Sequence, residues 1–462
     1  MPESVNGSAT PHRGAPRSFA TAQVQAGFVP GLAENTAVPS IHQSNAFEFR
    51  SLSEARDLFA LRRDGNIYSR AANPTVLVFE RRVAELEGGI AAAGVASGQA
   101  AVAVALLALA KQGEHIVAAR QLYGGTIDLL GDTFADWGIE VTFVDQDDLA
   151  AWEAAVRPTT RALFAESISN PIAQVLDLGA VAAVARRAGV PLVIDNTVAT
   201  PYLQRAKDFG ADIVVHSATK FLGGHGTSLG GVVVDLGTFD FTADPDRWPQ
   251  LTRTYARVPD GSLVERFGAT GSPYIALVKT KYVHDLGPSL SAFNAFQLLQ
   301  GIETLDLRVQ RHTASALTVA RFLESHPAVA RVHHPGLESS PWHRRAQAYL
   351  PHGAGSVFAF DLPSSGDDEA DFRLVEDVIA RLQVIKLVAN IGDARSLVAH
   401  PASMTHSHMT PTQLADAHIG STTVRLSIGL EDARDLVDDL ARALDPLVEA
   451  SVRQELAESR SR

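Results

Sequence analysis

One lysine of this chain stands in a setting that suits covalent chemistry. The chain contains six lysines, and only Lys220 lies between a short apolar run (residues 212–215) and a glycine-rich stretch (residues 221–231). A lysine at a strand end can form an imine with an aldehyde cofactor once its pKa is lowered. The alternative is an ordinary surface lysine. It is disfavoured because Ser217, Thr219 and the following glycines suit a phosphate group.

A carboxylate follows the preceding apolar run. Asp195 directly follows residues 191–194, which are predicted to form a strand buried on both faces. An unpaired buried carboxylate is costly, so Asp195 requires a cationic partner. A protonated pyridine nitrogen would serve, and the pair would strengthen the ring as an electron sink. The alternative is a cap for the following helix.

Two further segments suit the phosphate and the ring of such a cofactor. Ser97, Gly98 and Gln99 open a helix predicted over residues 100–111, and the N–H groups at a helix start attract phosphate. Tyr123 follows a predicted strand, where its ring could stack on a pyridine. A plain capped helix and ordinary core packing remain the alternatives for these two motifs.

An arginine inside an apolar strand suggests an anionic substrate. Arg425 lies within residues 423–429, where a guanidinium is costly unless it meets an anion. Its planar fork suits a carboxylate, so a substrate carboxylate is favoured over a structural salt bridge. The loop that carries His400, His406 and His408 contains no carboxylate, and the chain has no cysteine, so no metal is expected.

These side chains need a scaffold, and the sequence predicts a parallel α/β sheet. From about residue 74 short apolar runs alternate with helical stretches. A helix is expected from its Asp177 cap to Gly189. Ligands of open α/β sheets bind at the carboxyl ends of the strands, so Asn170, Asp195 and Lys220 should meet at one edge. The predicted strands are 115–119, 140–144, 161–165, 191–194 and 212–215.

The later part of the chain changes character twice. Residues 236–267 are rich in Asp, Pro, Arg and Trp, and we interpret them as an insertion near the site. A long helical pattern over residues 291–323 then leads to a smaller α/β domain, with apolar runs at 356–360 and 424–428.

Composition limits the possible classes of protein. The absence of cysteine excludes disulfides, thiolate metal sites and a cysteine nucleophile. A net charge of −12 disfavours nucleic acid and anionic lipid as partners. No apolar run is long enough to span a bilayer and no signal peptide is visible, so a cytoplasmic protein with small-molecule substrates is expected.

Together these motifs resemble the pyridoxal-phosphate (PLP) dependent Cys/Met metabolism family, the transsulfuration enzymes. The resemblance covers about residues 18–450 and rests mainly on DNT at 195–197 and HSATKFLGGHG at 216–226. It implies an α/β PLP-dependent transferase of fold type I, aspartate-aminotransferase-like, with a large mostly parallel sheet domain and a smaller C-terminal α/β domain. The implied division is a disordered tail (1–17), an arm reaching a neighbouring subunit (18–75), a PLP-binding large domain (76–298) and a small domain (299–462).

The resemblance also implies a role for each candidate residue. Lys220 would carry PLP and move protons, Tyr123 would be a second catalytic residue, and Asp195 would pair with the ring nitrogen. The phosphate would be held by Ser97, Gly98, Gln99, Ser217 and Thr219, and by Tyr68 and Arg70 of a neighbouring subunit in a homotetramer built from dimers that share sites. The substrate carboxylate would be bound by Asn170, Ser396 and Arg425.

Two segments resemble one branch of the family. Residues 293–305 and 392–396 are typical of enzymes that replace the acetate of O-acetylhomoserine with sulfide to give homocysteine for methionine biosynthesis. Gly125 stands where methionine γ-lyases typically carry cysteine. The alternatives are a cystathionine γ-synthase or γ-lyase, an O-succinylhomoserine sulfhydrylase, and a catalytically silent binding protein. The sequence leaves open the acyl group, activity on O-acetylserine, and free or carrier-bound sulfur.

Overall fold

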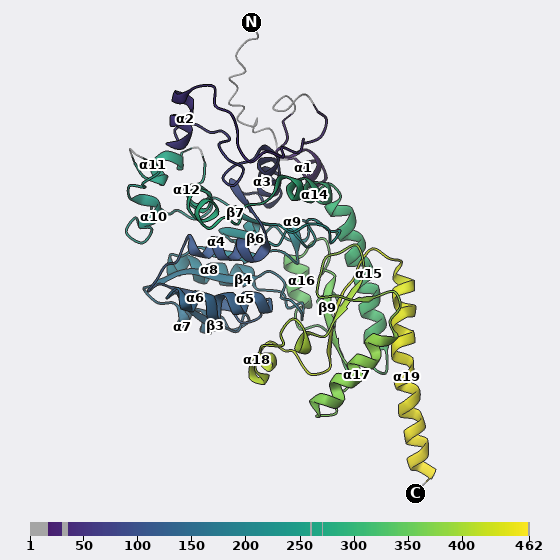
Figure 1. Cartoon of the computed structure of the whole chain (residues 1–462). Coiled ribbons are helices and arrows are strands. Elements are labelled where there is room, and N and C mark those ends of the chain that lie inside the picture. The colour runs from purple at the N-terminus through teal and green to yellow at the C-terminus, as the bar shows by residue number, and fades with distance from the viewer. Residues whose placement is uncertain (1–16, 30–35, 259–260, 270, 461–462) are drawn as a thin grey trace.

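The computed structural model describes residues 17–29, 36–258, 261–269 and 271–460. The predicted tail, residues 1–17, therefore lies outside the described residues except for Arg17. A seven-stranded sheet and a five-stranded sheet each form the centre of a layer of the molecule, and the long helix α15 (Leu305–Ser325) runs beside the smaller one (Figure 1).

The larger sheet confirms the predicted α/β class. Its strand order is β1-β7-β6-β5-β4-β2-β3, and the pairs from β6 to β3 are parallel. The predicted strands at 115–119 and 140–144 are confirmed without change as β2 and β3. The strands are β1 (Ala91–Val95), β2 (His115–Ala119), β3 (Glu140–Val144), β4 (Thr160–Glu166), β5 (Leu192–Asp195), β6 (Ile213–His216) and β7 (Gly231–Asp235).

One edge of this sheet is antiparallel, which the sequence did not indicate. Strand β7 runs antiparallel to both β1 and β6. Its residues form an apolar run like those of the parallel strands, so the direction of the strand cannot be read from hydrophobicity.

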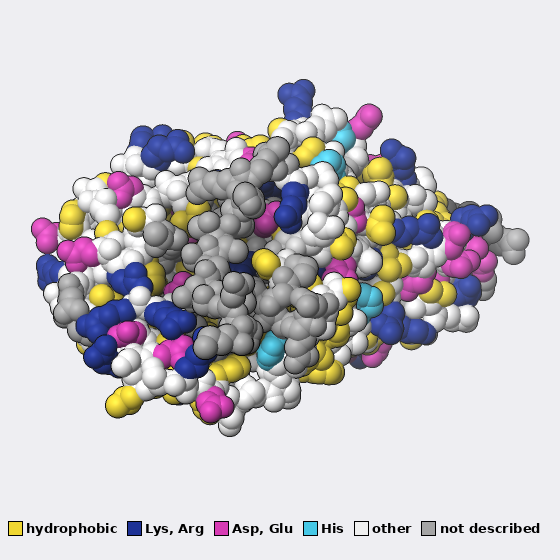
Figure 2. Space-filling model, turned by 90° about the horizontal axis from the view of Figure 1, so that it is seen from above, with side chains coloured by type: hydrophobic (Ala, Val, Ile, Leu, Met, Phe, Trp, Pro, Cys, Tyr) yellow, Lys and Arg dark blue, Asp and Glu magenta, His cyan; other side chains and the backbone are white. Residues whose placement is uncertain are grey.

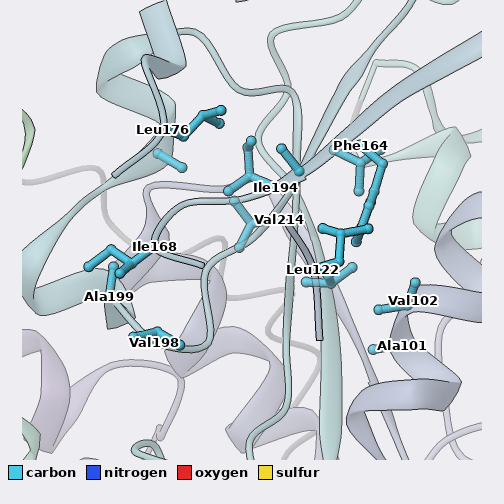
Figure 3. Close-up of a cluster of buried hydrophobic side chains, with 14 of the residues drawn as sticks. Ala101, Val102, Leu122, Phe164, Ile168, Leu176, Ile194, Val198, Ala199 and Val214 are labelled. Carbon is cyan, nitrogen blue, oxygen red and sulfur yellow. The ribbon is translucent and has the colours of Figure 1, made fainter. Parts of the chain in front are cut away.

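The interior of the sheet is apolar on both faces. Figure 3 shows Phe164, Ile194 and Val214 on neighbouring strands, with Val102 of a covering helix nearby. All four side chains are buried. Such packing fixes the strands in place, so the residues at their carboxyl ends are held on a rigid support.

The helices that flank the site begin and end at capping residues. Helix α8 (Leu178–Ala188) begins after Asp177, whose side chain accepts from the Ala180 N–H, and ends at left-handed Gly189, both as predicted. Helix α4 (Gly98–Leu107) is shorter at its C-terminus than predicted. Ser97 caps it by accepting from the Ala100 N–H.

The helical pattern over residues 291–323 contains two helices rather than one. Helix α14 (Ala292–Ile302) and helix α15 are separated at Glu303 and Thr304. The remaining helices of eight or more residues are α2 (Leu52–Phe59), α3 (Pro74–Glu87), α17 (Asp368–Arg381) and α19 (Ala433–Arg460).

The smaller sheet has the order β10-β11-β12-β9-β8 and places β12 (Thr423–Ser427) at its centre. Strands β9 (Val357–Asp361) and β12 confirm the two predicted apolar runs. Its other strands are β8 (Arg331–His333), β10 (Lys386–Leu387) and β11 (Leu397–Ala399).

The arm lies over the end of the molecule that Figure 2 shows from above, with helices α1 (Phe19–Gln25) and α2. On this face Lys and Arg side chains lie among Asp and Glu side chains. Within the arm, Arg63 pairs with Glu54. Leu52 and Phe59 on α2 are exposed, so the arm has little core of its own.

Candidate active site

A pocket of about 290 Å³ opens at the carboxyl ends of β4, β5 and β6. Residues of both sheet domains line it, including Asn390 and Arg425 from the smaller one. The structure brings most of the predicted site residues together here: Ser97, Gly98, Gln99, Tyr123, Asn170, Asp195, Ser217, Thr219, Lys220 and Arg425.

Lys220 lies just beyond β6 and faces the small domain. Its Nζ donates to the Asn390 Oδ1 at 2.5 Å. Burial lowers the pKa of Lys220 to about 8, and the positive charge of Arg425 adds to this effect. More of the amine is therefore uncharged near neutral pH than for an exposed lysine, as attack on an aldehyde requires.

Asp195 is a partly buried carboxylate at the end of β5. Its Oδ1 accepts from the Thr197 N–H at 2.9 Å, and burial raises the pKa of its carboxyl group. In the described part of the chain no lysine or arginine forms an ion pair with Asp195. A protonated ring nitrogen would satisfy this carboxylate, so the residue fits PLP.

The N-terminus of α4 fits a phosphate group. The first-turn N–H groups of a helix have no intrahelical partners and attract anions. A side chain at Gly98 would collide with Ser217, so glycine lets the helix start and the Ser217 loop lie against each other. Thr219 completes this wall, with its Oγ1 accepting from the Gly230 N–H at 3.0 Å.

Tyr123 forms another wall of the pocket, and its side chain is half-exposed. A Cβ at Gly125 would lie only 2.7 Å from the Tyr123 ring. In this arrangement glycine at position 125 leaves room for the ring, which a larger residue would displace.

Arg425 is buried and meets only neutral acceptors. Its Nη1 donates to the Asn170 Oδ1 at 3.3 Å, and its Nη2 donates to the Asn390 carbonyl at 3.1 Å. Its Nε has no hydrogen-bond partner in the described structure, and burial lowers its pKa to about 10. A buried guanidinium with an unpaired N–H is suited to a carboxylate brought by a ligand.

Ser396 does not lie in the pocket, in contrast to the prediction. Its Oγ donates to the Glu431 Oε2 at 2.7 Å and accepts from the Gly429 N–H at 2.8 Å. The hydroxyl is thus occupied within the small domain. The sequence does not show which way this hydroxyl points.

Tyr68 and Arg70 do not reach the pocket of their own chain. They lie on the arm, where the Arg70 Nη1 donates to the His284 carbonyl at 2.6 Å. No described residue of the 236–267 segment lines the pocket of its own chain, so the structure gives no support to the expectation of an insertion near the site. Its short helices α10 (Pro249–Thr252) and α11 (Leu263–Phe267) instead pack with α12 (Pro273–Leu277).

Sequence analysis missed Glu166, Asn390 and Thr405, all of which line the pocket. Glu166 could have been found by the argument used for Asp195, because it also ends a buried strand. Asn390 gives no such signal, because only the contact between domains reveals its role.

The histidine-rich loop has ordinary structural contacts. His400 bonds the Ser403 hydroxyl and the Ser421 carbonyl, and His408 pairs with Asp128. The described residues contain no group of three or more His, Cys, Asp or Glu side chains arranged for a metal ion. None of the described helices has both the length and the apolar character needed to cross a membrane.

Comparison with protein families gives one match that spans nearly the whole chain. The model of the Cys/Met metabolism PLP-dependent enzymes matches residues 20–445. An O-acetyl-L-homoserine sulfhydrylase of Leptospira meyeri is 42% identical over 443 residues, 93% of this chain and 97% of the relative. One from Corynebacterium glutamicum is 44% identical, over 91% and 95% of the two chains.

Solved structures agree with these relatives. An O-acetylhomoserine (thiol)-lyase of Campylobacter jejuni, which carries a pyridoxyl-lysine monophosphate, matches with a TM-score of 0.88 and 34% identity, over 93% of this chain and 100% of that one. A cystathionine γ-lyase of Lactobacillus plantarum matches with a TM-score of 0.77 and 30% identity, over 92% and 98% of the chains.

Proposed function

Because the chain belongs to the family of Cys/Met metabolism PLP-dependent enzymes, we propose that it converts O-acetyl-L-homoserine and sulfide into L-homocysteine and acetate. Several relatives named as O-acetylhomoserine sulfhydrylases or homocysteine synthases support this reaction. The observation that carries it is the buried guanidinium of Arg425, whose Nε lacks a hydrogen-bond partner, in the same pocket as Lys220, because an amino acid substrate brings one α-carboxylate to that position.

The pocket favours an uncharged acyl group. Among its described lining residues the only cationic side chains are Lys220 and Arg425. A succinyl ester would bring a second carboxylate, for which this chain supplies no further cation in the pocket. The acetyl ester needs none.

We assign the chemistry to the side chains that meet in the pocket. PLP, when bound, supplies the electron sink that makes the α-carbon of the substrate acidic. Lys220 binds the cofactor, and its Nζ, with a pKa of about 8, takes the Cα proton and later returns it. Asn390 directs that Nζ, while Asp195 holds the charge of the ring nitrogen.

The remaining residues bind and orient. Ser97, Gly98, Gln99, Ser217 and Thr219 would hold the phosphate, and Tyr123 would stack on the ring. Asn170 and Arg425 would bind the substrate carboxylate. Fixing the substrate in this way turns proton transfer into a reaction between neighbouring groups.

We also propose a homotetramer built from dimers that share sites, in the cytoplasm. The arm supports it, because residues 18–75 expose Leu52, Phe59 and Tyr68. In this assembly Tyr68 and Arg70 reach the phosphate site of the neighbouring subunit, which belongs to the large domain, residues 76–298. The small domain, residues 299–462, supplies Asn390 and Arg425.

A competition assay tests the reaction. The purified protein with PLP receives O-acetylhomoserine together with equal concentrations of sulfide and cysteine, and mass spectrometry identifies the product. Homocysteine is expected. Cystathionine would instead assign the chain to the synthase branch, of which a solved structure from Xanthomonas oryzae matches with a TM-score of 0.78.

Parallel assays define the ester and exclude a binding protein. The kcat/KM for O-succinylhomoserine should be at least about tenfold lower than that for O-acetylhomoserine, because the extra carboxylate of the succinyl ester must be buried without a partner. Absence of turnover with every acyl ester and nucleophile would leave a PLP-binding protein without this activity.

A further inference from the structure

A second carboxylate lies beside Asp195 at the base of the pocket. Glu166 ends β4, and the pairing of β4 with β5 places it directly opposite Asp195. Both side chains line the pocket, and Glu166 is only 5% exposed. Asp195 already supplies the anion for the ring nitrogen, so the presence of Glu166 requires a different reason.

The Glu166 carboxylate binds the backbone of two separate loops. Its Oε1 accepts from the Tyr123 N–H at 2.6 Å, and its Oε2 accepts from the Asn170 N–H at 3.1 Å. The Tyr123 loop follows β2, whereas the Asn170 loop follows β4 itself. One side chain therefore joins two walls of the pocket.

Each of these loops carries a group with a role in the proposed reaction. The Tyr123 ring faces the cofactor position, and the Asn170 Oδ1 accepts from the Arg425 Nη1. A shift of either backbone would move the ring or the carboxylate-binding amide by the same amount. Displacements of this size are costly where reacting groups must be held closely.

We propose that Glu166 is a positioning residue, which sets the Tyr123 wall and the Asn170–Arg425 pair relative to each other through its two backbone hydrogen bonds. This inference rests on the proposed function, which gives Tyr123 and Arg425 their roles. It assigns to Glu166 no contact with the reacting atoms.

The need for two acceptor atoms explains why a glutamate occupies this position. Burial, and then the charge of Asp195, raise the pKa of Glu166 well above its usual value, while the two N–H donors oppose this rise. A glutamine has the same shape but only one acceptor atom. Its amide NH₂ would face either the Tyr123 or the Asn170 N–H, so one wall would lose its anchor.

The test compares Glu166→Gln with a matched control, Glu80→Gln. Glu80 is also 5% exposed and also accepts a backbone N–H, from Gly94 at 2.8 Å, but its other oxygen pairs with Lys279 and it does not line the pocket. Both variants should lose thermal stability. Only Glu166→Gln should bind PLP about tenfold more weakly and lose visible circular dichroism, which reports how the ring is held.

Steady-state kinetics provide a second readout. In Glu166→Gln the KM for O-acetylhomoserine should rise about tenfold, by more than kcat falls, because the carboxylate-binding pair is loosened while Lys220 is intact. Glu166→Asp, which keeps two acceptor atoms but is one methylene shorter, serves as the second variant if Glu166→Gln does not fold.

Three outcomes would overturn the proposal. They are wild-type cofactor affinity and dichroism in Glu166→Gln, equal losses in Glu80→Gln, or failure of both Glu166 variants to fold while Glu80→Gln folds. Cofactor affinity and dichroism are measured without substrate. A wild-type protein that binds PLP but makes no homocysteine would therefore reject only the proposed function.

Discussion

At the scale of single residues, the site works by burying groups that water would otherwise keep in their usual ionisation states. Burial lowers the pKa of Lys220 to about 8 and that of Arg425 to about 10, and it raises the pKa of Asp195. In the described structure these three groups form hydrogen bonds with neutral partners, and in the proposed reaction each would meet a charged counterpart in the cofactor or the substrate.

Replacing Lys220 by alanine should abolish covalent attachment of the cofactor. After reduction with borohydride, the wild-type protein should gain the mass of one reduced pyridoxyl phosphate, and peptide mapping should place it on Lys220. Lys220→Ala should gain none, whereas the control Lys111→Ala should behave like wild type. A modified lysine elsewhere in the chain would disprove the assignment.

The pH dependence of cofactor uptake tests the electrostatics of the same residue. Protonated Lys220 cannot attack the aldehyde, so the rate of PLP uptake by the apoprotein should rise with pH to a midpoint near 8. Arg425→Gln removes a positive charge that disfavours protonated Lys220. The midpoint should therefore move upward, toward the ordinary lysine value of about 10.4.

The upward shift in Arg425→Gln should be only partial, because burial is the larger cause of the low pKa and persists in the variant. Arg187→Gln, at an exposed position, is the control and should titrate as wild type. A midpoint unchanged in Arg425→Gln would show that the two charges do not interact.

The sequence was sufficient for residues whose type and position inside a strand or just after one already define their chemistry. Lys220, Asp195 and Arg425 are of this kind, and all three line the pocket. It was insufficient for Asn390, which meets Lys220 across 170 positions of the chain. Ser396 shows the converse error, since a characteristic motif does not show which way a hydroxyl points.

At the scale of elements, apolar runs and caps predicted strands β2 to β6 of the larger sheet and helices α4 and α8. They could not reveal the antiparallel β7, because strand direction depends on partners far away in the chain. In the small domain, a buried carboxylate plays a similar organising role. Asp439 of α19 accepts from the N–H groups of Gln383, Val384 and Ile385 at 2.8–2.9 Å.

Asp439→Asn should therefore detach the segment between α17 and β10 from α19. We expect a loss of about 2 to 3 kcal/mol, seen as a melting temperature lower by roughly 5 °C or more at pH 7. The neighbouring and exposed Asp438→Asn is the control. An unchanged melting temperature in Asp439→Asn would contradict this account.

The melting temperatures of Asp439→Asn and of the wild-type protein should converge at low pH. The pKa of Asp439 is lowered in the folded state by its hydrogen bonds to the three N–H groups. Its contribution to stability is therefore present above the unfolded pKa of about 3.9 and is lost as the pH falls from there through the folded pKa. The difference in melting temperature should shrink below about pH 4.

At the scale of the whole molecule, the proposed shared site predicts complementation between two inactive proteins. Lys220→Ala lacks the lysine, and a Tyr68→Ala, Arg70→Ala double variant lacks the arm residues. In a hybrid dimer one site combines an intact Lys220 with an intact arm. Mixed and refolded equally, the two variants should recover roughly a quarter of wild-type activity, because half of the dimers are hybrid and each has one intact site.

Unmixed samples of each variant, refolded in the same way, are the control for that experiment. If the activity of the mixture is no greater than the mean activity of the two unmixed samples, Tyr68 and Arg70 do not contribute to the neighbour's site. The arm would then have a structural role alone.

The central position of β12 in the small sheet has a consequence for biosynthesis. The strand carries Arg425 and pairs with both β11 and β9. A ribosome has already produced Lys220, Asp195 and the whole of the larger sheet when β12 is still inside its exit tunnel. The residues proposed to hold the phosphate and the ring nitrogen are therefore synthesised long before Arg425, which is proposed to bind the substrate carboxylate.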